Sequence, residues 1–192
     1  MTGRGWRLGF AAALLALSVG AAAAQKAPPT DPENTVVMEL VYGRIIIELR
    51  PELAPKTVAR FKELVRKNFY DGLTFHRVIP GFMAQGGDPQ GDGQGGSGQN
   101  IPAEFSKEKH VRGTVSMARK ADDPNSADSQ FFIVVRETSD LDGKYTIFGR
   151  VIEGMDHVDR IKKGSKALEG RVLHPDKIRQ MRMINDPVKP NK

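Results

Sequence analysis

The sequence predicts a mainly β fold in which one antiparallel sheet closes on itself and two helices cover its ends. Short β-rich runs follow one another along the chain, separated by turn residues, and only two segments carry apolar residues at helical spacing. Many short strands with so few helices favour an antiparallel sheet over alternating strand–helix units. The chain has 192 residues, 39% hydrophobic and 27% charged, as expected for one globular domain.

A hairpin is expected at the start of the folded domain. Residues 36–41 and 44–49 are β-rich, and a Tyr-Gly pair between them supplies the turn. Ile45, Ile47 and Leu49 alternate onto one face of the second run, which predicts that this face is buried. Further short strands are expected at residues 74–79, 82–85, 113–118, 131–135, 145–151 and 179–184.

Two helices are expected. The first follows Pro55, and its apolar residues repeat at helical spacing: Val58, Phe61, Leu64 and Val65. The second spans about 155–163, with Gly164 as its C-terminal stop.

The first residues have the pattern of a cleaved secretory signal. Arg4 and Arg7 precede an apolar run at residues 8–19, and small residues follow it up to Ala24. That run is short of the roughly 20 strongly apolar residues of a spanning helix, so we expect no stable membrane insertion after cleavage. The pattern predicts a periplasmic protein. The expected divisions are a signal peptide at 1–24, a Pro-rich linker at 25–34, a folded domain at 35–186 and a polar tail at 187–192.

Charge and composition exclude several classes of function. The formal net charge is +6, but Lys and Arg are interspersed with Asp and Glu, which indicates a mixed-sign surface and no nucleic-acid partner. The chain has no Cys, which excludes disulfides, thiol nucleophiles and thiolate metal sites. The histidines lack the spacing of metal ligands and are expected at the surface or in the core with their polar atoms satisfied: His76, His110, His157 and His174.

A Gly-rich stretch imitates two ligand-binding motifs. Residues 91–96 fit the dinucleotide pattern G-x-G-x-x-G, but no buried strand precedes them and no helix can start after them. The stretch from Asp88 also resembles a calcium loop, yet Gln99 stands where a bidentate Glu is required. We therefore expect a surface loop, with no metal and no cofactor.

Four segments carry a resemblance to a known family. Residues 75–88 read FHRVIPGFMAQGGD, and the later segments are Ser-Met-Ala at 116–118, SQFFI at 129–133 and LDGKY at 141–145. In this order they closely resemble the signature segments of cyclophilins, and the similarity extends from about residue 35 to residue 184. The Met-Ala-Arg run at 117–119 resembles exported bacterial members.

The resemblance implies a fold and an activity. The family fold is an eight-stranded antiparallel closed β-barrel capped by two α-helices. The implied activity is peptidyl-prolyl cis/trans isomerisation without a cofactor, acting on proline-containing polypeptides and unfolded exported proteins. A monomer is expected. Tyr145 stands where family members often have His, and Asp140 stands where they often have Trp.

The chemistry of this reaction needs no acid, base or nucleophile. Rotation about a prolyl amide breaks its resonance, against a barrier of about 18–20 kcal/mol. In the twisted state the nitrogen gains a lone pair that accepts a hydrogen bond. A catalyst therefore needs a donor aimed at that nitrogen, an apolar slot for the ring and a clamp on the flanking backbone. Arg77 is the natural donor, because its guanidinium carries several N–H groups.

The other site residues follow from this requirement and from the family pattern. The residues expected to be catalytic are Arg77, Phe82, Gln85 and Phe132, and those expected to bind substrate are Met83, Ala118, Gln130, Leu141 and Tyr145. Period-two alternation places Gln130 and Phe132 on one face and Phe131 and Ile133 on the other. The alternative is a binding module or holdase chaperone of the same fold that grips proline segments without isomerising them. The presence of Arg77 favours catalysis.

Overall fold

An antiparallel sheet of eight strands forms the frame of the protein in a computed structural model, which describes Met1 and residues 31–187. The order in the sheet is β3-β4-β6-β5-β7-β2-β1-β8, and every paired neighbour is antiparallel. The strands are β1 Thr35–Leu40, β2 Gly43–Leu49, β3 Arg77–Ile79, β4 Met83–Gly86, β5 Thr114–Met117, β6 Phe131–Val134, β7 Ile147–Glu153 and β8 Gln180–Met183. The mainly β prediction with eight antiparallel strands is confirmed.

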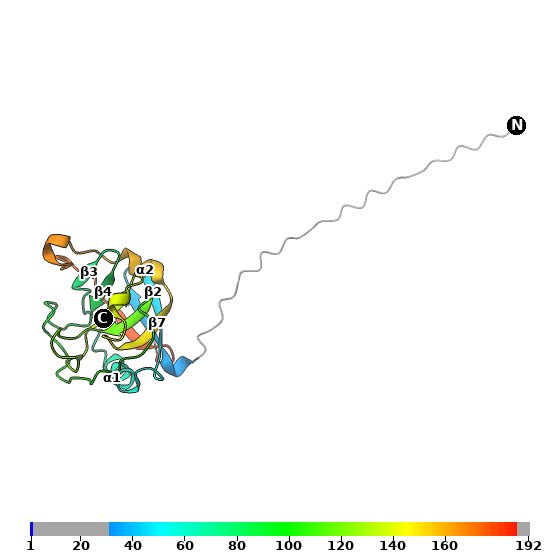
Figure 1. Cartoon of the computed structure of the whole chain (residues 1–192). Coiled ribbons are helices and arrows are strands. Elements are labelled where there is room, and N and C mark those ends of the chain that lie inside the picture. The colour runs from blue at the N-terminus through cyan, green and yellow to red at the C-terminus, as the bar shows by residue number, and fades with distance from the viewer. Residues whose placement is uncertain (2–30, 188–192) are drawn as a thin grey trace.

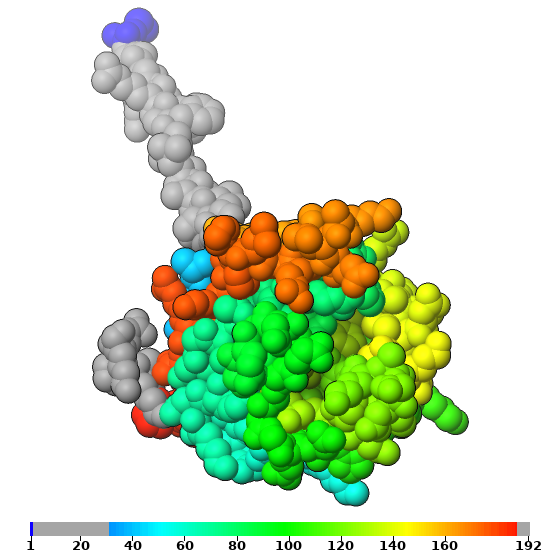
Figure 2. Space-filling view, turned by 90° about the vertical axis from the view of Figure 1, so that its left-hand side faces the viewer, coloured from blue at the N-terminus to red at the C-terminus, as the bar shows by residue number. Residues whose placement is uncertain are grey.

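The sheet curls into an open half-barrel, so the expectation of a closed barrel is wrong. β3 and β8 lie at the two ends of the strand order, and no ladder joins them. A segment without a β-strand, residues 164–178, lies along the edge of β3 instead: the Val78 N–H donates to the Gly170 carbonyl at 2.7 Å, and the Val172 N–H donates to the His76 carbonyl at 2.9 Å. Gly170 has a φ of 85°, which a strand does not allow. The space-filling view shows this segment in orange across one side of the molecule (Figure 2).

Two α-helices lie at opposite ends of the sheet (Figure 1). α1 spans Pro55–Arg66 and buries the four apolar residues expected from its sequence, with Pro at its first position. Its N-terminus is capped from another part of the chain, because the Glu104 carboxylate accepts from the N–H groups of Lys56 at 3.0 Å and Thr57 at 2.9 Å. The negative charge of this carboxylate also interacts favourably with the positive end of the helix dipole.

The second helix is shorter than expected. α2 spans Met155–Arg160, and the chain turns to an extended conformation at Ile161, with ψ 134°. The predicted end at residue 163 is wrong, and Gly164 is not the helix stop. A Cβ on Gly164 would lie 1.9 Å from the Gly170 carbonyl oxygen, so glycine is needed there for close backbone packing.

Three short 3₁₀ helices were not expected from the sequence: Pro32–Asn34, Ser139–Leu141 and Lys166–Leu168. The first of these helices lies at the end of the expected linker. The other residues of the linker, 25–30, lie outside the described residues, as does the expected signal peptide apart from Met1. The tail from residue 188 lies outside them as well. None of the helices in the described part of the chain is long and apolar enough to cross a membrane.

The core lies between the inner face of the sheet and α1. Ile45, Ile47 and Leu49 are at most 2% exposed, which confirms the predicted inward face of β2. Rings from three parts of the chain meet at the centre: the Phe61 ring lies 4.8 Å from Phe148 and 5.8 Å from Phe131 between centroids. Burying each such ring contributes about 1.5–3 kcal/mol. This packing fixes β6, whose other face carries the site.

Candidate active site

An open cavity of about 460 Å³ lies over the face of the sheet that points away from the core. Eight of the nine expected site residues line it: Arg77, Phe82, Met83, Gln85, Ala118, Phe132, Leu141 and Tyr145. The ninth, Gln130, lines a neighbouring cavity of about 330 Å³ that shares Gln85 and Ala118 with the first. The structure therefore brings together residues that lie up to 68 positions apart in the sequence, from Arg77 to Tyr145. Asp140 is exposed and is not among the lining residues of either cavity.

The floor of the cavity is apolar. Met83, Phe132 and Val134 form a buried cluster separate from the main core, and Met83 lies opposite Val134 in the β4–β6 ladder. The flanking side chains packed against this cluster are Ile79, Phe82, Ala118, Leu141 and Tyr145. The Tyr145 ring meets Phe132 edge to face, with centroids 5.6 Å apart. The result is an apolar slot in the floor of the cavity.

Strand alternation produces this floor, as the sequence predicts. Phe131 and Ile133 are fully buried in the main core, whereas Phe132 belongs to the separate cluster on the opposite face. Gln85 lies opposite Phe132 in the β4–β6 ladder, so a polar side chain follows directly beside the apolar floor.

A row of hydrogen bonds forms the polar edge of the cavity. Arg77 Nη1 donates to Gln85 Oε1 at 3.3 Å, and Gln85 Nε2 donates to Gln130 Oε1 at 2.9 Å. Gln130 Nε2 then donates to the Gly95 carbonyl at 2.8 Å. The β3–β4 register places Arg77 opposite Gln85, which accounts for the first of these contacts.

Arg77 is also held from its other side. Its Nε donates to the backbone carbonyl of Glu169 at 3.0 Å. Glu169 has a φ of 51°, a left-handed conformation that is uncommon outside glycine. A guanidinium has five N–H groups. Among the described residues, Arg77 donates hydrogen bonds from two of its N–H groups, those of Nε and Nη1. Its side chain also lines the cavity.

The sequence did not identify Glu169 as a site residue. The signal available was weak, since Glu169-Gly170 reads as an ordinary turn and the contact uses a carbonyl that every residue has. Arg119 was also missed. Its guanidinium lies 4.8 Å from the centroid of the Tyr145 ring, and its Nε donates to the Lys144 carbonyl at 3.0 Å.

His110 supports the floor from behind. Its ring is stacked on Phe132 with centroids 6.2 Å apart and an angle of 17° between planes. Its nitrogens contact Asp142 Oδ1 and Ser116 Oγ, each at 3.0 Å, which matches the expected core histidine with satisfied polar atoms. Burial lowers the pKa of His110, although Asp142 opposes that shift. The backbone N–H of His110 is the main cause that lowers the pKa of Asp142 to about 2.

His76 contradicts the expectation that a core histidine has its polar atoms satisfied. It is 5% exposed and lines the cavity, and neither ring nitrogen has a hydrogen-bond partner among the described residues. Burial is the main cause that lowers its pKa, so the neutral ring is favoured. Within residues 31–187, no group of three or more His, Cys, Asp or Glu side chains gathers as a metal site would require.

Comparison with known proteins decides the family. Residues 35–183 match the family model described as cyclophilin type peptidyl-prolyl cis-trans isomerase/CLD. The chain belongs to the cyclophilin family. The cyclophilin is 55% identical over 180 residues to a protein of Brucella suis named "Probable peptidyl-prolyl cis-trans isomerase", covering 88% of this chain and 90% of that one. The expected enzyme class, peptidyl-prolyl cis-trans isomerase, is thereby confirmed.

Solved structures agree with this assignment. Cyclophilin AquaCyp293 from Hirschia baltica has 32% sequence identity and a TM-score of 0.73, with 82% of this chain and 76% of that chain covered. A cyclophilin-type isomerase of Cryptosporidium parvum, crystallised in the presence of the dipeptide Ala-Pro, has 30% identity and a TM-score of 0.71. That comparison covers 79% of this cyclophilin and 99% of the parasite chain.

Proposed function

We propose that this cyclophilin isomerises X-Pro bonds of exported proteins by stabilising the twisted amide non-covalently, with Arg77 as the hydrogen-bond donor. The observation that carries the proposal is the placement of Arg77. Its guanidinium is held by Gln85 and by the Glu169 carbonyl at the edge of an apolar slot. The C. parvum structure obtained with Ala-Pro supports proline-containing peptides as the ligands of such a slot.

The catalytic step moves no atoms between enzyme and substrate. As the amide twists, its nitrogen loses conjugation with the carbonyl and becomes a hydrogen-bond acceptor. An N–H of Arg77 donates to that nitrogen, while the ring stays in the slot over Phe132 and Met83. The planar cis and trans forms lack this acceptor, so the bond lowers the barrier more than it strengthens ground-state binding.

Preorganisation determines how much this bond contributes. An Arg side chain that must be ordered at each turnover loses much of its rotamer freedom. Here two acceptors, Gln85 Oε1 and the Glu169 carbonyl, already restrain the guanidinium. We assign the remaining hydrogen-bonding capacity of the Gln85 and Gln130 amides to the peptide backbone around the proline. Loss of one preorganised donor costs roughly 10²–10³ in rate.

The place of action follows from the N-terminal sequence. The basic start, the apolar run at 8–19 and the small residues up to Ala24 support export and cleavage. We assign the mature protein to the periplasm, as a monomer that acts on unfolded exported proteins. N-terminal sequencing of periplasmic material tests this assignment. A mature chain beginning within a few residues of Gln25 supports it, and periplasmic protein that still begins at Met1 contradicts it.

The mechanism is tested with Arg77→Ala in a protease-free rotamase assay on an Ala-Pro peptide. Activity is expected to fall about 10²–10³-fold, because the donor to the twisted amide is lost. Arg136→Ala is the matched control, since Arg136 is exposed and does not line either cavity. Full activity in folded Arg77→Ala would remove Arg77 from this role. A wild type that binds the peptide without accelerating its isomerisation would instead support the binding-module alternative.

A further inference from the structure

The Gly-rich loop at residues 88–99 supplies the last acceptor in the row of hydrogen bonds at the polar edge of the cavity. The Gly95 carbonyl accepts the hydrogen bond of Gln130, so the position of this loop sets where the row ends. Asp88 holds the first part of the loop, accepting from the N–H groups of Gln90 at 2.9 Å and Gly93 at 2.6 Å. Burial opposes ionisation of Asp88, but backbone N–H groups outweigh it and keep the pKa of this carboxyl below its usual range.

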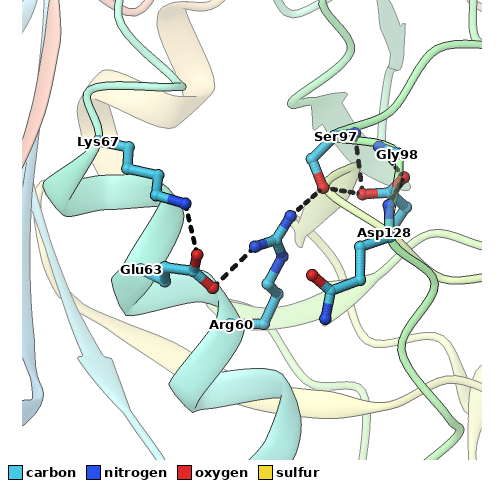
Figure 3. Close-up of polar contacts among 7 residues, drawn as sticks. Arg60, Glu63, Lys67, Ser97, Gly98 and Asp128 are labelled. Atoms are coloured by element: carbon cyan, nitrogen blue, oxygen red, sulfur yellow. Dashed lines mark hydrogen bonds and ion pairs between the residues drawn. The ribbon is translucent and has the colours of Figure 1, made fainter.

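Asp128 holds the second part of the loop. Oδ1 accepts from the Ser97 N–H at 2.9 Å, and Oδ2 accepts from the N–H groups of Gly98 at 2.9 Å and Gln99 at 3.2 Å. The Ser97 hydroxyl donates to Oδ1 as well. A Cβ on Gly96 would lie 2.4 Å from Oδ2, so the backbone wraps closely around the carboxylate. Figure 3 shows Ser97 and Gly98 gathered around Asp128.

A second contact ties this loop to α1. Arg60 Nη2 donates to the Ser97 hydroxyl oxygen at 2.8 Å, and Arg60 Nη1 contacts Glu63 at 2.7 Å (Figure 3). The Arg60 side chain is only 11% exposed, so it is restrained between the helix and the loop. Ser97 thus accepts from Arg60 and donates to Asp128 through one hydroxyl group.

Asp128 and the site residues come from one stretch of chain. Asp128 and Gln130 lie directly before β6, and the chain has a bend at residue 129. Ser129, between the first two, is fully buried and donates through its hydroxyl to the Gly87 carbonyl at 2.8 Å. The anchor of the loop, the amide of Gln130 and the ring of Phe132 therefore belong to one stretch of chain that is attached to the core through Ser129 and β6.

We propose that Asp128 is a positioning residue for the isomerase site. Its carboxylate holds residues 97–99, this places the Gly95 carbonyl, and the carbonyl orients Gln130 and through it Gln85 and Arg77. The inference rests on the isomerase function proposed for this site. An ionised carboxylate is required, because it accepts from four donors and offers none to the loop.

The first test is Asp128→Asn, which keeps the shape but turns an NH₂ group toward backbone N–H groups. We expect kcat to fall about tenfold, with KM changed by less than about twofold, because orientation of the donor is lost and the slot remains. Asp123→Asn is the matched control. Asp123 also accepts a backbone hydrogen bond, from Asn125 at 2.8 Å, and does not line either cavity. Its kcat is expected to stay at the wild-type value.

A double-mutant cycle separates positioning from general stability. If Asp128 acts through Gln130, Asp128→Asn should cost less than about twofold in kcat once Gln130→Ala is present. The full loss in both backgrounds would overturn the proposal, as would unchanged kcat in the single mutant. Should Asp128→Asn fail to fold, Ser97→Ala, which removes only the hydroxyl between Arg60 and Asp128, takes its place in the cycle.

The cycle also distinguishes this proposal from the proposed mechanism. Coupling between Asp128 and Gln130 is a ratio of rates that does not depend on which group donates to the amide nitrogen. Full activity of Arg77→Ala together with strong coupling would contradict only the role of Arg77. Loss of activity in Arg77→Ala without coupling would contradict only the positioning role of Asp128.

Discussion

The floor and the polar edge of the cleft are built in different ways. Met83 and Phe132 in the floor come from adjacent strands, are at most 5% exposed, and owe their positions to a regular ladder. Arg77 at the edge starts from a three-residue strand and is held by irregular chain, at the Glu169 carbonyl. The comparison suggests that the floor provides stability and binding together, whereas the edge provides rate with little stability.

Removal of a floor side chain should give the largest combined effect. Phe132→Ala is expected to cost about 3–5 kcal/mol of unfolding free energy, because a buried ring leaves a cavity under Tyr145 and beside His110. Activity should fall as well, since the slot loses its base. Phe105→Ala is the control: this ring is 43% exposed, and its loss should change stability by less than about 0.5 kcal/mol. Denaturant unfolding and the rotamase assay measure both quantities. Wild-type stability of Phe132→Ala would contradict the floor's structural role.

The pH dependence of stability should reflect protonation of the buried histidines around the cavity. Burial lowers the pKa of His110 and of His76 in the folded protein. The unfolded chain therefore binds more protons below about pH 6.5, and stability is lost as the pH falls through that region. A second loss is expected at lower pH, because folding lowers the pKa of the Asp142 carboxyl from 3.8 to about 2. The ionised carboxylate stabilises the fold at pH values above the pKa of the unfolded chain, and this contribution is lost as the pH falls through the pKa of the folded protein.

Thermal unfolding at several pH values tests this account. Between pH 7 and pH 5 the Tm of the wild type should fall, and the fall should be smaller in His110→Gln, which has no imidazole to protonate. His174→Gln is the control, because His174 is exposed and does not line either cavity. If Tm fell equally with pH in His110→Gln and wild type, the pKa of His110 would not differ between the folded and unfolded states.

A smaller effect on activity is expected from changes at Glu169, which holds Arg77 through its backbone carbonyl. The Glu169 carbonyl, and not its side chain, accepts from Arg77, and the residue has a φ of 51°. Glu169→Gly should leave kcat/KM within about twofold of wild type without lowering Tm, because glycine adopts this conformation without steric cost. Glu169→Pro should lower kcat several-fold, since proline fixes φ near −65° and moves the carbonyl. Equal activity of the two variants would show that this contact does not orient Arg77.

The sequence predicted the parts of the molecule that follow local periodicity. Alternation in β2 and β6 correctly gave the buried faces, and helical spacing correctly gave α1. The floor of the cleft follows from the same alternation. The sequence also predicted which residues would meet at the cleft, although their grouping came from the resemblance to cyclophilins and not from periodicity.

The parts that were missed depend on contacts between distant backbone segments. The closed barrel was wrong because residues 164–178 pair with the edge of β3 through backbone N–H and carbonyl groups that leave no trace in composition. Gly164 read as a helix stop, but its role is close packing against Gly170. Asp128 reads as an ordinary loop residue until the structure shows four donors around it.

The central claim is that Arg77 stabilises the twisted amide and not the bound ground state. Exchange NMR on a saturating Ala-Pro peptide measures the rate of isomerisation on the enzyme, and titration of the same sample measures Kd. For Arg77→Ala we predict a rate on the enzyme about 10²–10³-fold lower than wild type, with Kd changed by less than about threefold. A Kd that weakens as much as kcat/KM falls, with the rate on the enzyme unchanged, would contradict the claim and assign Arg77 to substrate binding alone.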